Sequence, residues 1–228
     1  MNRMIALNQT LSFFKGTYQD LKDSSDDPGV LNQEKMDWAQ TTLQRFNIEP
    51  EIKGEVQLDP SLLFVGNHIS YMDIPLLLAT APKMSFVAKH EISRWPIFGN
   101  GAKKLDTIFV KRGKDSSRKA TAKTIKDSLN LGKRIVVFPS GTTSIDGLKR
   151  WRKGIFEIAE SSNCWTQPFR ISYTPLREVA YIDRDFFPTH LYKLFGSEDI
   201  KAKIEFHEPV KIKDPIPDCN KWQAWAQE

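Results

Sequence analysis

The sequence predicts an α/β protein in which a mixed, largely parallel sheet is sandwiched by helices and preceded by an N-terminal pair of helices. From residue 51 onward, short apolar runs alternate with helical patterns, which is typical of strand–helix units. Hydrophobic residues make up 40 % of the 228 residues, and 14 Phe and 6 Trp are enough for a packed core. The first 48 residues carry helical periodicity only. Two parts are therefore expected, a helical membrane-association segment over 1–48 and a main domain over 49–228.

The first predicted helix covers residues 1–22 and carries one narrow apolar stripe. The stripe consists of Met4, Leu7, Leu11, Phe14, Tyr18 and Leu21, at spacings of three and four. After the break DSSDDPG, Asn32 is expected to cap a second helix that has Met36, Ala39, Leu43 and Phe46 on one face. The stripe either packs on the main domain or lies in a membrane surface. Both interpretations hold if one face of the helix packs on the main domain and another face contacts the membrane.

The main domain is expected to alternate strands and helices. Strands are predicted at 51–58 (short, with a turn), 62–65, 84–89, 108–110, 134–138 and 167–173, and at 204–206 with 210–212. Helices are predicted at 71–80, 115–129, 152–161 and 222–228. The longest stretch poor in charge, 60–82, contains His68, Asp73 and Pro75, which a membrane-spanning helix would not carry. The N-terminal residues lack the apolar core of a signal peptide, so a cytoplasmic protein is expected.

The charge is concentrated in the middle of the chain. Between Lys103 and Lys153 there are 15 Lys or Arg and 4 Asp, a net charge of +11, whereas the remaining residues carry −6. Such a segment indicates an anionic partner, or else the solvated flank of a helix. The two cysteines, Cys164 and Cys219, exclude a disulfide scaffold and show no metal-ligand spacing.

A histidine and an aspartate follow the buried strand at 62–65. His68 and Asp73 are five residues apart across a strand-to-helix turn, where active sites lie in open α/β sheets. A carboxylate in this position can hold one ring nitrogen and leave the other as a general base. The alternative is a structural pair, in which the histidine caps the helix and the aspartate fills its first turn.

Three further segments end or begin strands. Residues 106–112 place Lys111 and Arg112 at a strand end, which suits a phosphate. Residues 138–144 (FPSGTTS) form a glycine-containing turn whose backbone N–H groups can face an anion. Residues 167–171 open a further strand with a proline.

Together these four blocks resemble the glycerolipid acyltransferase family of the 1-acyl-sn-glycerol-3-phosphate acyltransferase type. The NHxxxxD motif, the G-x-I-F-I-x-R motif, the F-P-E-G-T-R-S motif and a proline-led strand occur in the family's order, over about 38–214. The resemblance implies transfer of a fatty acyl group from acyl-CoA or acyl-carrier protein to the hydroxyl of a lysophospholipid. The acceptor expected first is 1-acyl-sn-glycerol-3-phosphate, which would give phosphatidic acid. His68 would act as the general base, Asp73 would orient His68, and Arg112 would bind the phosphate of the acceptor.

The resemblance also implies roles for the loop at 138–144 and for the surroundings of the protein. Ser140, Gly141 and Thr142 would belong to the acceptor pocket, and Lys111 would add a charge nearby while facing away. No cofactor and no nucleic acid are expected. The expected location is the cytoplasmic face of a membrane, as a peripheral protein.

Three positions depart from the family pattern. Ser140 stands where Glu is usual, Thr143 where Arg is frequent, and Lys111 where Asp is frequent. These changes leave the histidine and aspartate in place but put the acceptor in question, so a different lysolipid is an alternative. Two further hypotheses are a catalytically degenerate lipid-binding relative and a module that binds nucleic acid or anionic lipid.

Overall fold

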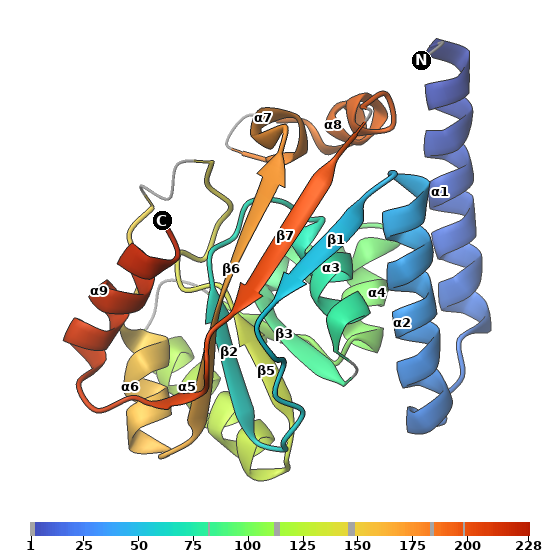
Figure 1. Cartoon of the computed structure of the whole chain (residues 1–228). Coiled ribbons are helices and arrows are strands. Elements are labelled where there is room, and N and C mark those ends of the chain that lie inside the picture. The colour runs from blue at the N-terminus through green and yellow to red at the C-terminus, as the bar shows by residue number, and fades with distance from the viewer. Residues whose placement is uncertain (1–2, 82, 112–114, 146–148, 183–184, 198) are drawn as a thin grey trace.

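The computed structural model describes residues 3–81, 83–111, 115–145, 149–182, 185–197 and 199–228 (Figure 1). The elements follow in the order α1 (Arg3–Asp23), α2 (Pro28–Arg45), β1 (Glu49–Lys53), β2 (Leu62–Gly66), α3 (Asp73–Thr80), β3 (Met84–Lys89), the 3₁₀-helix η1 (His90–Arg94), α4 (Phe98–Lys104), β4 (Ile108–Val110), α5 (Asp115–Asn130), β5 (Arg134–Val137), α6 (Gly154–Ser161), β6 (Trp165–Thr174), α7 (Leu176–Val179), α8 (Phe187–Leu194), β7 (Lys201–Phe206), β8 (Val210–Lys211) and α9 (Pro215–Trp225).

The described strands form one mixed sheet, as predicted. Their order is β1-β7-β6-β2-β5-β3-β4, with β8 paired to β6. The five strands from β6 to β4 along this order run parallel, while β7 and β8 run antiparallel to β6. Strand β6 is longer than predicted, and Pro168 lies inside it. On this edge, β6 pairs with β8 before Pro168 and with β7 after it. Proline has no backbone N–H to donate, and Pro168 lies where the neighbouring strand changes from β8 to β7.

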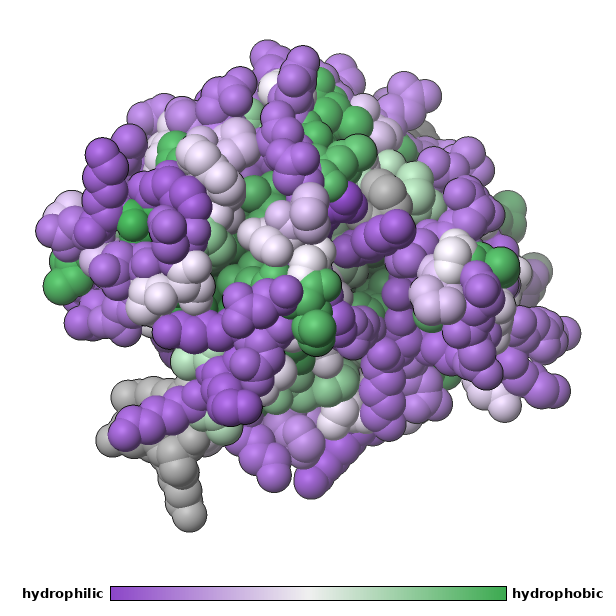
Figure 2. Space-filling model, turned by 90° about the horizontal axis from the view of Figure 1, so that it is seen from below, coloured by the Kyte–Doolittle hydropathy of each residue, from purple (hydrophilic) through white to green (hydrophobic). Residues whose placement is uncertain are grey.

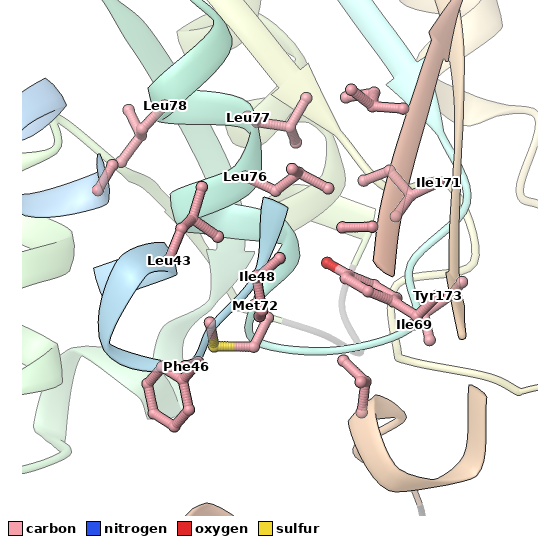
Figure 3. Packing of buried hydrophobic residues seen from close by; sticks show 14 of the residues in the cluster. Leu43, Phe46, Ile48, Ile69, Met72, Leu76, Leu77, Leu78, Ile171 and Tyr173 are labelled. Atoms are coloured by element: carbon pink, nitrogen blue, oxygen red, sulfur yellow. The ribbon is translucent and has the colours of Figure 1, made fainter. Parts of the chain in front are cut away.

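The two faces of the sheet carry two separate cores, because alternate strand residues point to opposite sides. Leu62 and Phe64 of β2 belong to the core that includes residues of α1, α2, α3 and α8. Leu63 and Val65 of the same strand belong to the core formed with α5, α6 and α9. In Figure 3, Leu76 and Leu77 of α3 extend toward the strand that carries Ile171, and Met72 lies beside Phe46. The predicted sandwich is thus confirmed.

The N-terminal helices form a pair beside α3, α4 and α8 (Figure 1). Helix α2 begins at Pro28 and not at residue 33. Its N-cap is Asp27, whose carboxylate accepts from the backbone N–H groups of Gly29 and Val30, so the Asn32 prediction is wrong. Proline suits this start because the first helical N–H has no partner inside the helix. No helix in the described part of the chain combines the length and apolarity needed to cross a bilayer.

Helix α1 packs through a face other than its predicted stripe. Its buried residues are Ala6, Thr10, Phe13 and Thr17. Of the predicted stripe, Met4, Leu7, Leu11 and Tyr18 remain 71, 51, 60 and 56 % exposed. Phe14 is the inward member of that stripe, with its ring 5.9 Å from Phe98 and 6.3 Å from Phe187. The helix therefore uses one face for packing and leaves an apolar stripe to the outside.

Two further boundaries differ from the predictions. The predicted strand at 51–58 is β1 at Glu49–Lys53, and the predicted C-terminal helix at 222–228 is α9 at Pro215–Trp225. Helix α9 begins directly after Asp214 and buries Trp222 and Cys219 under the sheet. The helix begins seven residues before the predicted start, with Pro215 and Pro217 in its first turn, where a proline does not remove a hydrogen bond within the helix.

Candidate active site

His68 and Asp73 meet at the carboxyl end of β2. The strand ends at Gly66, where only a glycine fits, because an added Cβ would lie 2.4 Å from the Phe169 ring. The chain then turns and α3 begins at Asp73. This turn brings Nδ1 of His68 to 2.6 Å from Oδ2 of Asp73. The sequence placed the two residues at one turn, and the structure brings them together.

The carboxylate of Asp73 is fully buried and held by donors on both oxygens. The backbone N–H groups of Ile69 and Ser70 donate to Oδ2 at 2.8 and 3.2 Å. The Tyr173 hydroxyl donates to Oδ1 at 2.9 Å. Burial, and then the charge of Asp73, raise the pKa of Tyr173 well above its ordinary value, so the hydroxyl stays protonated and remains a donor. These donors hold the carboxylate in one orientation.

This hydrogen-bond pattern sets the tautomer of His68. Because Asp73 accepts at Oδ2, the proton of the imidazole resides on Nδ1, and Nε2 keeps its lone pair. Nε2 has no hydrogen-bond partner among the described residues. The Phe138 ring stacks on the imidazole at 4.0 Å and 11°, which holds the plane of the ring. The His68 side chain is 20 % exposed and lines a groove, so a ligand bound there can reach the ring.

The loop after β5 packs directly against this histidine. Ser144 donates its N–H to the carbonyl of His68 at 2.8 Å. Gly141 has a φ of 66°, the left-handed conformation that glycine adopts most readily, and its N–H donates to the carbonyl of Phe138. Gly141 and Thr142 line the same groove as His68.

Ser140 behaves differently from its predicted role. It is only 8 % exposed, and its hydroxyl donates to the carbonyl of Thr142 at 2.8 Å. The Ser140 side chain thus stabilises the loop through this hydrogen bond and does not line the groove. Thr142 and Thr143 do line it. Lys111 is exposed and lines this groove too, so it does not face away. Arg112 lies outside the described residues.

A long groove extends from His68. Its volume is about 2170 Å³, larger than the 300–1,000 Å³ of an ordinary small-molecule pocket. Three aromatic side chains that contact one another line part of it: Trp95, Phe98 and Phe187. Such a groove has room for a hydrocarbon chain.

A second layer of hydrogen bonds holds the turn between β2 and α3. His190 donates from Nε2 to the carbonyl of Ala180 at 3.0 Å, so its Nδ1 accepts from the Tyr71 hydroxyl at 2.9 Å. Burial lowers the pKa of His190, which keeps the ring neutral and suits this tautomer. The Asn67 amide also bridges to both backbone groups of Ile171. The turn is thus fixed from β6 and α8, which the sequence alone did not indicate.

Comparisons with known proteins agree with this arrangement. The family model described as Acyltransferase matches residues 47–172. A lyso-ornithine lipid O-acyltransferase of Pseudomonas aeruginosa is 32 % identical over 178 residues, which are 76 % of this chain and 68 % of that protein. A 1-acyl-sn-glycerol-3-phosphate acyltransferase of Neisseria gonorrhoeae is 26 % identical over 64 % of this chain and 58 % of its own length.

One solved structure shares the whole fold. The 1-acyl-sn-glycerophosphate acyltransferase of Thermotoga maritima superposes with a TM-score of 0.70 and covers 100 % of this chain and 95 % of its own. The sequence identity is 18 %, so this likeness concerns the fold.

Proposed function

The chain belongs to the acyltransferase family, and from that premise we propose that it transfers a fatty acyl group from a thioester to the free hydroxyl of a lysolipid. The observation that carries the proposal is the His68–Asp73 pair, with Nε2 of the histidine facing a groove large enough for a lipid chain. The donor is proposed to be acyl-CoA or acyl-carrier protein. The presence of the hydrogen-bonded His68–Asp73 pair supports an active enzyme over a catalytically degenerate relative.

The proposed step is a direct transfer. The acceptor hydroxyl gives its proton to Nε2 of His68 while its oxygen attacks the thioester carbonyl, which forms the new ester C–O bond. The C–S bond then breaks, and the proton passes from His68 to the sulfur to give the free thiol. No nucleophilic side chain is required because a thioester is already activated, so no acyl-enzyme is expected. Asp73 stabilises the charge on the imidazole while His68 holds the proton.

The acceptor favoured here is a lyso-ornithine lipid, with 1-acyl-sn-glycerol-3-phosphate as the second candidate. The relative from P. aeruginosa named for the first substrate is 32 % identical, whereas the N. gonorrhoeae relative named for the second is 26 % identical. The loop beside His68 presents Thr142 and Thr143, which are neutral, and Thr143 stands where the family frequently has an arginine. A lyso-ornithine lipid carries an amine and a carboxylate and no phosphate, so its head group needs fewer cations than a phosphomonoester does.

Membrane attachment is proposed to use the exposed stripe of α1, made of Met4, Leu7, Leu11 and Tyr18. Lysolipids reside in membranes, and an amphipathic helix of this kind can lie in the interfacial plane. Because the stripe faces away from the packed side of α1, insertion would leave the fold intact. The protein is therefore proposed to be peripheral, on the cytoplasmic face.

The test is a panel of lysolipids assayed by release of thiol from acyl-CoA and from acyl-carrier protein. His68→Ala is expected to lower kcat by at least about 100-fold, because general base catalysis contributes about 10²–10⁴-fold. Asp73→Ala is expected to do the same. The matched control is His207→Ala, since His207 lies on the other side of the sheet beside Trp222 and Trp225. Near-normal transfer by His68→Ala, in a protein that melts like the wild type, would refute the assignment.

The panel also separates the two acceptors. A higher kcat/KM for lyso-ornithine lipid than for 1-acyl-sn-glycerol-3-phosphate is expected in the wild type. Transfer to 1-acyl-sn-glycerol-3-phosphate alone would make that lipid the acceptor. Absence of transfer with every acceptor and donor would contradict the enzymatic proposal.

A further inference from the structure

A second cavity lies at the opposite end of the sheet from His68. It has a volume of about 1190 Å³ and opens between the α1–α2 turn, α4, and the amino ends of β3 and β5. Figure 2 looks onto this end of the molecule, where hydrophilic side chains predominate. Seven of the residues that line the cavity are cationic: Lys22, Lys35, Lys83, Lys103, Lys104, Lys133 and Arg134. Two acidic residues, Asp26 and Asp106, also line it, so the described residues of the cavity carry a net charge of +5.

Among the described residues, the cations that line this cavity outnumber the carboxylates that line it. Lys104 pairs with Asp26 at 3.2 Å, and Lys133 pairs with Asp106. Lys35 has no carboxylate within ion-pair distance among the described residues, although it is half-buried. Burial first, and then the neighbouring charges of Lys133 and Lys104, lower its pKa against the opposing effect of Asp106. An ammonium group so placed would be stabilised by an anion.

The cationic cavity adjoins the groove of the candidate active site. Both are lined by Leu21, Leu31, Lys35, Ile97 and Lys104. Along β3, Met84 lines the cationic cavity, while Phe86 through Lys89 line the groove that holds His68. Six strand residues at about 3.3 Å each place the two ends of β3 roughly 17 Å apart. A base therefore lies at one end of a continuous path and a cluster of cations at the other.

We propose that the cationic cavity binds the phosphate-bearing nucleotide end of coenzyme A, with the pantetheine arm extended along β3 toward His68. This inference rests on the proposed function. Coenzyme A has its 3′-phosphate and diphosphate at one end of a narrow arm and the thioester at the other, which matches the separation of cations and base. The acyl acceptor does not fit this arrangement, because its head group lies only a few bonds from its hydroxyl, and that hydroxyl must reach His68.

The shape of the cavity favours a small polyphosphate over a carrier protein. A protein partner buries about 800 Å² of each surface, mostly on exposed side chains. Here the side chains of Lys104 and Lys133 are only 34 and 37 % exposed, so the inner cations lie within a concavity. A nucleotide can enter such a concavity, and a folded carrier can reach only the rim.

The test compares ligands with and without phosphates on the full chain. Calorimetry is performed with coenzyme A and with pantetheine, which has the same arm but no nucleotide. Lys35→Gln and Lys104→Gln are each expected to weaken binding of coenzyme A about 10-fold, as the loss of a charge-assisted contact predicts. Binding of pantetheine is expected to be the same in the variants and the wild type. Lys213→Gln is the matched control, since Lys213 is exposed and lies outside both cavities.

Kinetics give a second readout. The KM for acyl-CoA is expected to rise about 10-fold in Lys35→Gln, whereas the KM for S-acyl-pantetheine is expected to stay constant. Equal affinity for coenzyme A in the wild type and in the Lys35→Gln/Lys104→Gln double variant would overturn the inference. So would a selective loss of transfer from acyl-carrier protein, or of binding to phosphatidylglycerol vesicles. Lysine-dependent binding of coenzyme A without any acyl transfer would refute the proposed function and leave this inference standing.

Discussion

Replacing Tyr173 with phenylalanine tests how the buried carboxylate of Asp73 is supported. The change removes one hydroxyl and leaves the aromatic ring in the core. That hydroxyl is the donor to Oδ1 of Asp73, at 2.9 Å, and both side chains are buried. Because neither group is accessible to water, Oδ1 loses a donor that solvent does not replace.

The size of the effect follows from the charge and the burial. A hydrogen bond to a charged group contributes about 1.5–3 kcal/mol. The free energy of unfolding should fall by that amount. For a chain of this size each kcal/mol shifts Tm by about 2–4 °C, so Tm should fall by about 3–12 °C. We expect kcat to fall about 10-fold as well, because the carboxylate that orients His68 through Oδ2 then loses the hydrogen bond that holds its other oxygen.

The assay is a double-mutant cycle in thermal and urea unfolding. Asp73→Asn replaces the carboxylate with an amide, which is a weaker acceptor, so Tyr173→Phe should cost at least about 1 kcal/mol less in that background. Tyr18→Phe is the control, since Tyr18 is 56 % exposed and its replacement should change stability by less than about 0.5 kcal/mol. Equal losses for Tyr173→Phe in both backgrounds would refute the argument that this hydroxyl acts through the carboxylate.

Three other outcomes are expected. Leu7→Ser with Leu11→Ser should weaken binding to neutral vesicles in high salt by about 1.5–3 kcal/mol, because each of the two side chains has about half of its 1.5–3 kcal/mol burial energy to gain; unchanged flotation would contradict this. His190 has a pKa below its ordinary 6.5, mainly through burial, so the free energy of unfolding should fall as pH drops below 6.5, and less steeply in His190→Gln. Gly66→Ala should cost about 2–3 kcal/mol by overpacking, whereas Gly154→Ala, with open space around it, should not; urea denaturation distinguishes them.

The local structure of this protein, meaning most of its strands and the turn after β2, could be predicted from the sequence. Short apolar runs predicted β2, β3, β4, β5 and β6, because the strands of the parallel part are buried on both faces and appear as continuous hydrophobic segments. The His68–Asp73 pair was readable for a related reason. Its two members are five residues apart, so a single turn after a strand is enough to bring them together.

The ends of the helices and strands, and the faces through which they pack, were harder to predict from the sequence. The periodic pattern of α1 correctly predicted a helix with an apolar stripe. The face that packs against the rest of the protein is a different one, formed by Ala6, Thr10, Phe13 and Thr17. Periodicity gives the existence of an apolar stripe, and only the neighbouring helices determine which face is covered. Ser140 shows the same limit, since a hydrogen bond within its own loop turns it away from the groove.

Only the tertiary structure determined what surrounds the histidine and where the cations gather. Tyr173 donates to Asp73 from a hundred residues away in the sequence. Phe138, which follows the neighbouring strand β5, stacks on His68. Lys35 of α2 lies close enough to Lys133 for the two charges to interact. None of these contacts has a local signal, because each depends on which strands become neighbours and on how the helices close over them. The sequence determined the proximity of His68 and Asp73, since their geometry is local. Folding determined the groove, the second donor to Asp73 and the cationic cavity, since each is assembled from segments that meet only in space.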